Sequence, residues 1–319
     1  MSAVYLDHVH LKRESKSFVD SLYAILTAAD LFNGTKYMLS GLTGMAFKFT
    51  VHERLLPLSV SAYGNWVDEH APALDNIGLH AEQDAGRTRH PTFQYYQQQA
   101  IEWIKQTLNQ GIGVIYWIPE FGVIRGYDDQ DEVFYVQDGL SLEDHIVLYD
   151  NLGLNMTEFW YVGVIDARIE VSLEKMVLES VRLALEDWNT PHKTLPNKDI
   201  ASGRLAYTFL IQALRSGSFD EQGARYIMSS YLYSRQEIKQ YLHDVRYLWP
   251  QLEAAYAAYD QLVTGMAGWD MHNQPELIAK LERAAELEES AMTQFRLLSA
   301  LFPDPSRETV RRWGRSTAR

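Results

Sequence analysis

The fold is decided by the stretch GVIYWIPEFGVIRGYD, residues 113–128, in which two runs of β-branched and aromatic residues flank a proline. Runs of this composition, bounded by Gly, Pro and Asp, are typical of strands. A third run covers residues 132–136 and a fourth covers residues 159–165. The acidic segment 126–131 suits a turn, because Asp side chains accept hydrogen bonds from neighbouring backbone amides. The sequence therefore predicts an antiparallel hairpin within a sheet.

Helical spacing surrounds this β-rich region and then replaces it. Residues 92–109 carry apolar side chains every three or four positions, which predicts an amphipathic helix that ends at Gly111. Beyond residue 172 the same spacing continues, divided by Pro and Gly into five or six helices, the longest over 275–301. We therefore expect an α+β domain with an antiparallel sheet over residues 1–172, and an all-α helical bundle over residues 173–319.

Composition excludes several classes of function. The chain has 319 residues, no cysteine, and 29 basic against 42 acidic side chains, a formal charge of −13. A negative field repels phosphate backbones and anionic lipids, so neither nucleic acid nor a membrane is an expected partner. The absence of cysteine removes disulfides, thiolate metal sites and cysteine nucleophiles. The first residues lack the basic and apolar regions of a signal peptide, and we expect a soluble, cytoplasmic protein.

Ser17 is the first candidate for chemistry. It precedes an apolar helical stripe that begins at Leu22, so it lies at a helix N-terminus. A nucleophile there gains from the positive end of the helix dipole. Alternatively, Ser17 is the N-cap and forms a capping-box-like pair with Asp20.

Glu120 and Asp138 are the second candidate. They stand at the outer ends of the two strands of the hairpin, where antiparallel pairing brings strand ends close together. Two carboxylates in such a place either perform acid–base chemistry or are solvated strand-end charges. No metal or cofactor motif accompanies them: the pair His8 and His10 supplies too few ligands for zinc, and no phosphate-binding glycine pattern occurs. We predict neither a metal nor a cofactor.

Three stretches, taken in order, resemble a known family. They are residues 17–22, residues 39–49, and the helix through residues 100–105 that leads into the strand at Gly113 and on to Gly126-Tyr127-Asp128. Together they resemble the N-terminal domain of butirosin biosynthesis protein H, a family related to bacteriocin-processing and papain-like cysteine peptidases. Residues 187–189 and 202–207 resemble the helical region of bacterial relatives. The resemblance implies a papain-like fold for the first half of the chain.

The resemblance also implies a catalytic triad in which two of the three members have changed. Matched onto this chain, the family's Cys position falls on Ser17, its His position on Glu120 and its Asp position on Asp138. In the family the thiolate attacks a carbonyl, the imidazole transfers protons and the acid orients the ring. A hydroxyl is a far poorer nucleophile than a thiolate, and a carboxylate is a weaker base than imidazole.

These substitutions lead to two functional hypotheses. The first is a catalytically degenerate papain-like domain that binds a peptide, an aminoacyl group or a small amine in a bacterial biosynthetic pathway, with an acyl-carrier protein as a further partner. The second is an active acyl or aminoacyl transferase, or an amide hydrolase, with Ser17 as nucleophile. A third hypothesis makes the chain an assembly partner whose Tyr-rich segment 226–241 forms an interface. Catalysis requires the Ser17 hydroxyl to lie within hydrogen-bond reach of Glu120 or a histidine.

Overall fold

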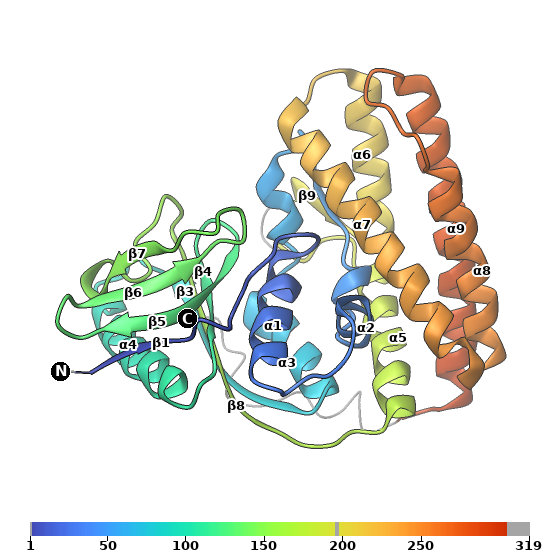
Figure 1. The fold of residues 1–319 in the computed structure, drawn as a ribbon. Helices are drawn as coiled ribbons and strands as arrows, with labels where there is room; N and C mark the ends of the chain where they lie inside the picture. The colour runs from blue at the N-terminus through green and yellow to red at the C-terminus, as the bar shows by residue number, and fades with distance from the viewer. Residues whose placement is uncertain (1, 195–197, 305–319) are drawn as a thin grey trace. The chain divides into compact units, whose positions relative to one another are not determined.

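The computed structural model describes residues 2–194 and 198–304 and has a mixed α+β architecture (Figure 1). The chain forms two compact units. Of the described residues, unit 1 contains 2–34 and 66–170, and unit 2 contains 35–65 together with the rest from 171 onward. The expected division at residue 172 lies close to the last crossing between units. Residues 35–65, which the sequence assigns to the first domain, belong to unit 2.

Unit 1 is built on a seven-stranded antiparallel sheet in the order β3-β8-β4-β5-β6-β7, with β1 paired to β5. The strands are β1 (Ala3–Tyr5), β3 (Leu79–Arg87), β4 (Val114–Trp117), β5 (Phe121–Asp128), β6 (Val133–Gln137), β7 (His145–Leu148) and β8 (Phe159–Arg168). Its helices are α1 (Ser17–Ala28), α3 (Trp66–Asn76) and α4 (Phe93–Asn109). The antiparallel sheet expected from the β-rich runs is confirmed.

Two turns fix the register of the central strands. Between β4 and β5, Trp117 pairs with Phe121, and the Ile118 amide donates to the Glu120 carbonyl at 2.9 Å. Between β5 and β6, the Asp128 carboxylate accepts the Gln130 amide at 2.7 Å, as the acidic turn predicted. Each strand therefore returns directly beside the one before it.

Unit 2 is mainly helical. Its helices are α2 (Lys36–Leu42), α5 (Leu173–Asn189), α6 (Arg204–Ser216), α7 (Glu221–Val245), α8 (Pro250–Gly265) and α9 (Gln274–Leu301). The short strands β2 (Thr50–His52) and β9 (Ile200–Ser202) pair antiparallel, so the second half of the chain is not purely α-helical as expected. Residues 305–319, which the expected bundle included, lie outside the described residues.

Aromatic contacts explain why residues 35–65 belong to unit 2. The Phe47 ring meets Phe295 of α9 edge-on at 5.7 Å, and the Phe49 ring lies 5.1 Å from Tyr207 of α6 and 4.9 Å from Tyr231 of α7. These are buried contacts between residues far apart in sequence, and local periodicity carries no sign of them.

The core of unit 2 also contains a buried charged network. The Arg235 guanidinium donates to Glu288 at 2.8 Å, and both side chains are about 1 % exposed. Tyr259 donates to the same carboxylate at 2.9 Å, Tyr207 also donates to it, and the Tyr207 and Tyr231 hydroxyls lie 2.7 Å apart. Burial, with Glu288 beside them, raises the pKa of Tyr207 and of Tyr259 well above the ordinary value, so both phenols act as donors. The Glu288 carboxylate of α9 thus binds side chains of α6, α7 and α8 in the core of unit 2.

No described helix combines the length and the apolar character needed to cross a membrane.

Candidate functional site

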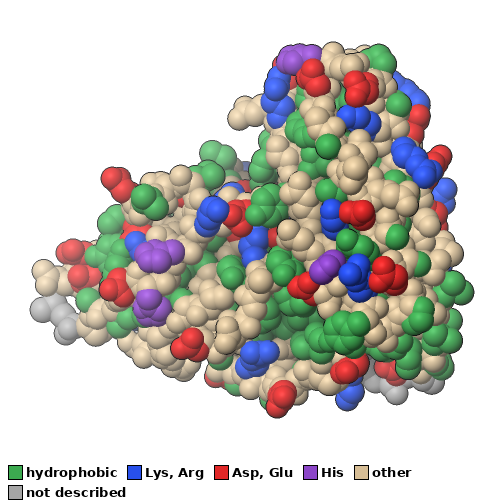
Figure 2. Space-filling model, turned by 45° about the vertical axis from the view of Figure 1, so that its right-hand side comes forward, with side chains coloured by type: hydrophobic (Ala, Val, Ile, Leu, Met, Phe, Trp, Pro, Cys, Tyr) green, Lys and Arg blue, Asp and Glu red, His purple; other side chains and the backbone are tan. Residues whose placement is uncertain are grey.

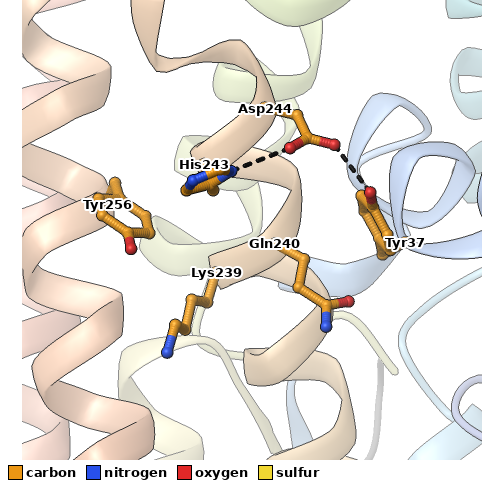
Figure 3. A pocket seen from close by; sticks show the side chains of 6 residues that line it. All are labelled: Tyr37, Lys239, Gln240, His243, Asp244 and Tyr256. Atoms are coloured by element: carbon orange, nitrogen blue, oxygen red, sulfur yellow. Dashed lines mark hydrogen bonds and ion pairs between the residues drawn. The ribbon is translucent and has the colours of Figure 1, made fainter.

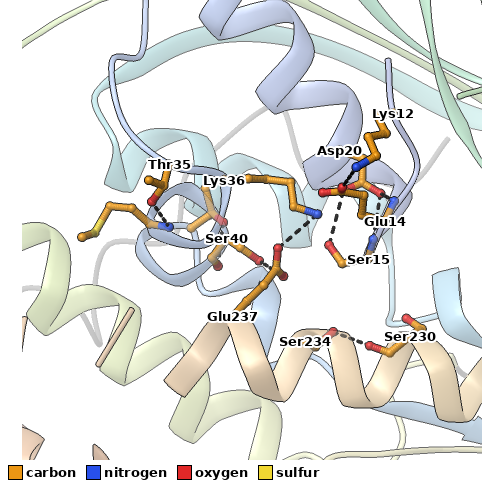
Figure 4. Close-up of polar contacts among 12 residues, drawn as sticks. Lys12, Glu14, Ser15, Asp20, Thr35, Lys36, Ser40, Ser230, Ser234 and Glu237 are labelled. Carbon is orange, nitrogen blue, oxygen red and sulfur yellow. Dashed lines mark hydrogen bonds and ion pairs between the residues drawn. The ribbon is translucent and has the colours of Figure 1, made fainter. Parts of the chain in front are cut away.

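Ser17 is the first residue of α1, and its hydroxyl does not cap that helix. The N-cap is Lys16, whose side chain makes no capping bond. Asp20 instead accepts the Glu14 amide at 2.7 Å and the Ser15 amide at 3.0 Å, which holds the segment that leads into α1 (Figure 4). The capping-box alternative, with Ser17 as the N-cap, is therefore wrong, because Asp20 binds amides that precede the helix.

The Ser17 hydroxyl is bonded to Glu120. Its Oγ donates to Glu120 Oε2 at 2.5 Å and accepts the Phe121 amide at 3.2 Å. Ser17 is 4 % exposed and Glu120 is 7 % exposed. One donor and one acceptor site of the hydroxyl are thus engaged by the turn between β4 and β5. The structure brings together two of the three residues singled out in the sequence, across more than a hundred positions of chain.

The backbone of Glu120 is held in an unusual conformation. Its φ is +109°, a region that residues with a side chain rarely adopt. Such a conformation costs about 1–3 kcal/mol and persists only where surrounding contacts impose it. Here the short turn and the bond to Ser17 together fix the residue.

The Asp138 carboxylate is not part of this pair. It accepts the Leu140 amide at 2.8 Å, the Ser141 amide at 3.1 Å and the His145 Nε2–H at 3.0 Å, and no hydrogen bond joins it to Glu120 within the described residues. Burial works against its ionisation, but these hydrogen bonds outweigh burial and hold the pKa of Asp138 below the ordinary value. The two carboxylates do not form a shared site, because the Asp138 carboxylate binds the amides of the turn that follows β6 and the His145 ring.

This lowered pKa gives a testable prediction. A carboxyl group whose folded pKa is below its unfolded value of about 3.9 stabilises the fold above that pH, and the contribution is lost as the pH falls through the folded pKa. We expect His145→Gln to raise the Asp138 pKa, measured by a carbon-13 NMR titration of the carboxyl group. His80→Gln, which alters the comparable exposed pair with Asp166, is the control. An unchanged Asp138 pKa in His145→Gln would contradict the assignment.

An aromatic cluster lies beside the Ser17–Glu120 pair. We define it by its members: Phe18, Trp66, His70, Trp117, Phe121, Phe159 and Tyr161. The residues that follow Ser17 and Glu120 in sequence, Phe18 and Phe121, meet edge-on with ring centroids 5.6 Å apart. His70 stacks on Phe18 at 3.4 Å. The pair therefore lies directly against an apolar wall.

Sequence reasoning missed His70. The residue is fully buried, and its Nδ1 lies 3.0 Å from the Tyr161 hydroxyl, which itself donates to Gln83 at 3.0 Å. Since that hydroxyl hydrogen points at Gln83, Nδ1 of His70 is the donor to Tyr161. No local motif marks His70, because its partners Phe18, Phe121 and Tyr161 lie on α1, β5 and β8 and not near it in sequence.

The aromatic cluster extends to the protein surface. Trp66 packs on Trp117 at 4.4 Å, on Phe121 at 5.1 Å and on Phe159 at 5.8 Å. Trp66 is half-buried and Phe159 is 39 % exposed. Three residues before Phe159, Met156 is 90 % exposed. The cluster thus offers aromatic surface to solvent at one end and reaches the buried pair at the other.

Unit 2 contains a separate pocket of about 300 Å³, which Figure 3 shows between α2, α7 and α8. Its wall carries two tyrosines and four polar side chains: Tyr37, Lys239, Gln240, His243, Asp244 and Tyr256. Asp244 accepts the Tyr37 hydroxyl at 2.8 Å and lies 3.0 Å from Nδ1 of His243. Within the Tyr-rich segment 226–241, which the third hypothesis makes an interface, Tyr231 and Tyr241 are buried in the core of unit 2.

Among the described residues, no group of three or more His, Asp or Glu side chains is arranged to hold a metal ion.

No protein-family model matches this chain, and no curated protein matches it either.

Proposed function

We propose that unit 1 is a papain-like domain in which a buried hydrogen bond has replaced the catalytic pair, and that it binds a peptide or aminoacyl group without cleaving it. The observation that carries the proposal is the Ser17–Glu120 bond, because the resemblance matches these two positions to the nucleophile and the base of the family. Ser17 begins helix α1, and Glu120 lies in the turn directly before strand β5. The bond therefore joins a helix N-terminus to the sheet.

Three features favour binding over catalysis. The nucleophile and the base are both nearly buried, which leaves a substrate carbonyl little access to Oγ. The third residue, Asp138, accepts hydrogen bonds from its own turn and from His145, so its carboxylate does not take the orienting role of the family's acid. A carboxylate is also intrinsically a weaker base than the imidazole of the family, and so a weaker acceptor for a serine proton.

The aromatic cluster supplies the binding surface. Trp66 and Phe159 present aromatic area at the surface, where an apolar or aromatic side chain of an aminoacyl group gains free energy by leaving water. Ligands of this class, including an aminoacyl group delivered by an acyl-carrier protein, would contact the cluster without reaching Ser17. We place the activity of the chain in a biosynthetic pathway on the strength of its family resemblance.

Two measurements test the proposal. The first treats the wild type, Ser17→Ala and Glu120→Gln with a fluorophosphonate probe, and we expect no labelling of any of them. Labelling of the wild type that disappears in Ser17→Ala would overturn the proposal.

The second measurement follows tryptophan fluorescence while N-acetyl-phenylalanine amide is added. We expect saturable binding that weakens roughly tenfold in Trp66→Ala, since an aromatic contact worth about 1.4 kcal/mol is removed. Trp249→Ala, which removes a half-buried tryptophan of unit 2, is the matched control. Equal affinity in the wild type and Trp66→Ala would contradict the binding surface.

The active enzyme is the second candidate, and one observation favours it. The Ser17 hydroxyl points its hydrogen at a carboxylate 2.5 Å away, the geometry of a nucleophile and its base. In that reaction Oγ would bond to the carbonyl carbon, its proton would pass to Glu120, and Glu120 would return the proton to the leaving amine. The fluorophosphonate outcome separates the two candidates.

A further inference from the structure

β7 forms one edge of the sheet of unit 1. Its register pairs it with β6, from Val133 opposite Leu148 to Val136 opposite His145. Within the described part of the chain no strand pairs with its other side, and Figure 1 shows it as the outermost strand beyond β6. An edge strand presents unpaired amides and carbonyls that can accept another strand.

The side chains at this edge are unusually apolar for their exposure. On β7, Ile146 is 61 % exposed and Leu148 is 47 % exposed. In the loop that leads into the strand, Leu140 is 77 % exposed and Leu142 is 96 % exposed. Natural edge strands are commonly protected by Lys, Pro or bulges, and β7 with its preceding loop has no Lys or Pro. Leaving four large aliphatic side chains in water costs free energy that a bound partner would recover.

The charge around this edge is negative. The described residues of unit 1 carry eight Lys or Arg against 22 Asp or Glu, a net of −14, whereas those of unit 2 carry 16 against 19, a net of −3. Glu143 and Asp150 flank β7 at its two ends, and Asp131 and Glu132 lie in the turn before β6; all four are exposed. Figure 2 shows, by contrast, basic and acidic side chains standing beside one another over the helical unit.

We propose that the β7 edge binds an extended, basic segment of a partner protein, which adds a strand to the sheet. Main-chain hydrogen bonds to β7 would supply affinity for any extended chain. Apolar side chains of the partner would cover Ile146 and Leu148, and its Lys or Arg side chains would meet the flanking carboxylates. A second copy of this chain fits poorly, since pairing two β7 edges would bring the same acidic residues against each other.

The test measures fluorescence anisotropy of a labelled nine-residue peptide in which lysine alternates with valine. We expect saturable binding to the full chain that weakens with salt, as attraction between opposite charges requires. Two comparison peptides follow: one with glutamate in place of lysine, and one with alternate backbone amides methylated so that the charge stays but strand pairing is blocked. Both are expected to bind at least about tenfold more weakly.

Substitutions locate the site on the protein. The double variant Ile146→Lys, Leu148→Lys is expected to lose roughly tenfold or more in affinity, because apolar contact is removed and like charge is added. Glu143→Gln, Asp150→Asn is expected to lose about threefold and to show a weaker salt dependence. Leu297→Lys, at a leucine of α9 that is 53 % exposed, is the matched control and is expected to bind as the wild type does. Circular dichroism verifies that each variant is folded.

Two results would overturn the proposal. One is equal binding of the methylated peptide, which would mean charge attraction without strand addition. The other is a concentration-dependent dimer in sedimentation measurements that Ile146→Lys, Leu148→Lys abolishes, which would identify a second copy as the occupant.

Discussion

Arg235→Met is expected to lower the free energy of unfolding of unit 2 by about 3–5 kcal/mol, the largest single effect that we predict. The substitution keeps most of the side-chain volume but leaves the Glu288 carboxylate in the core without its cation. Tyr207 and Tyr259 still donate to that carboxylate, yet neutral donors do not replace the charge of a guanidinium. Chemical denaturation measures the loss, and hydrogen exchange assigns it to α7 and α9.

A second substitution separates this charge effect from lost packing. Adding Glu288→Gln to Arg235→Met removes the unpaired charge while keeping an acceptor for the tyrosines, and we expect the double variant to be more stable than Arg235→Met alone. The exposed pair Arg215 and Glu282 is the control, and Arg215→Met is expected to cost less than about 1 kcal/mol. A double variant no more stable than Arg235→Met would show that packing dominates.

Ser17→Ala is expected to destabilise unit 1 by about 1–3 kcal/mol, although serine and alanine differ by one atom. The change removes the donor to Glu120 and the acceptor of the Phe121 amide, both in a buried region. If the Ser17 hydroxyl did not contribute to folding, the same substitution would change the free energy of unfolding little. Thermal and chemical denaturation, with hydrogen exchange at β5 as the local probe, measure the effect.

The strained backbone of Glu120 gives a paired comparison. Glu120→Gly and Glu120→Ala both delete the bond to Ser17, but only glycine adopts the φ of +109° without penalty. We expect the glycine variant to be more stable than the alanine variant by about 1 kcal/mol. Equal stability of the two would mean that the turn relaxes once the carboxylate is gone.

The sheet was largely predictable because its strands are local and strongly β-branched. The hairpin through Asp128, the helix over 93–109 and the long helix that ends at Leu301 follow from periodicity and turn chemistry. Residues 35–65 were misplaced because what assigns them to unit 2 is contact between rings such as Phe49 and Tyr231, which no window of sequence contains. The same limit explains why the helical half was expected to lack strands, since β9 is too short to show a period.

The candidate site was predictable only in part. The resemblance pointed to Ser17 and Glu120, and the structure places the two side chains in contact. The same resemblance and the strand pairing also pointed to Asp138. Its carboxylate instead accepts the Leu140 and Ser141 amides, which follow it closely in sequence, and, in the part of the chain that the structure describes, makes no bond to Glu120. His70 could not be found, since a lone buried histidine has no spacing to recognise.

Over the residues that the structure describes, the chain passes from one unit to the other three times, after residues 34, 65 and 170. Because each unit is built from separated stretches of the chain, dividing the gene at one position cannot yield either unit complete. During synthesis the ribosome delivers the middle of unit 1 before the bulk of unit 2, so residues 35–65 must wait for helices that have not yet been translated. Their apolar side chains, Phe47 and Phe49 among them, then stay without their native contacts on the nascent polypeptide until α6, α7 and α9 have been made.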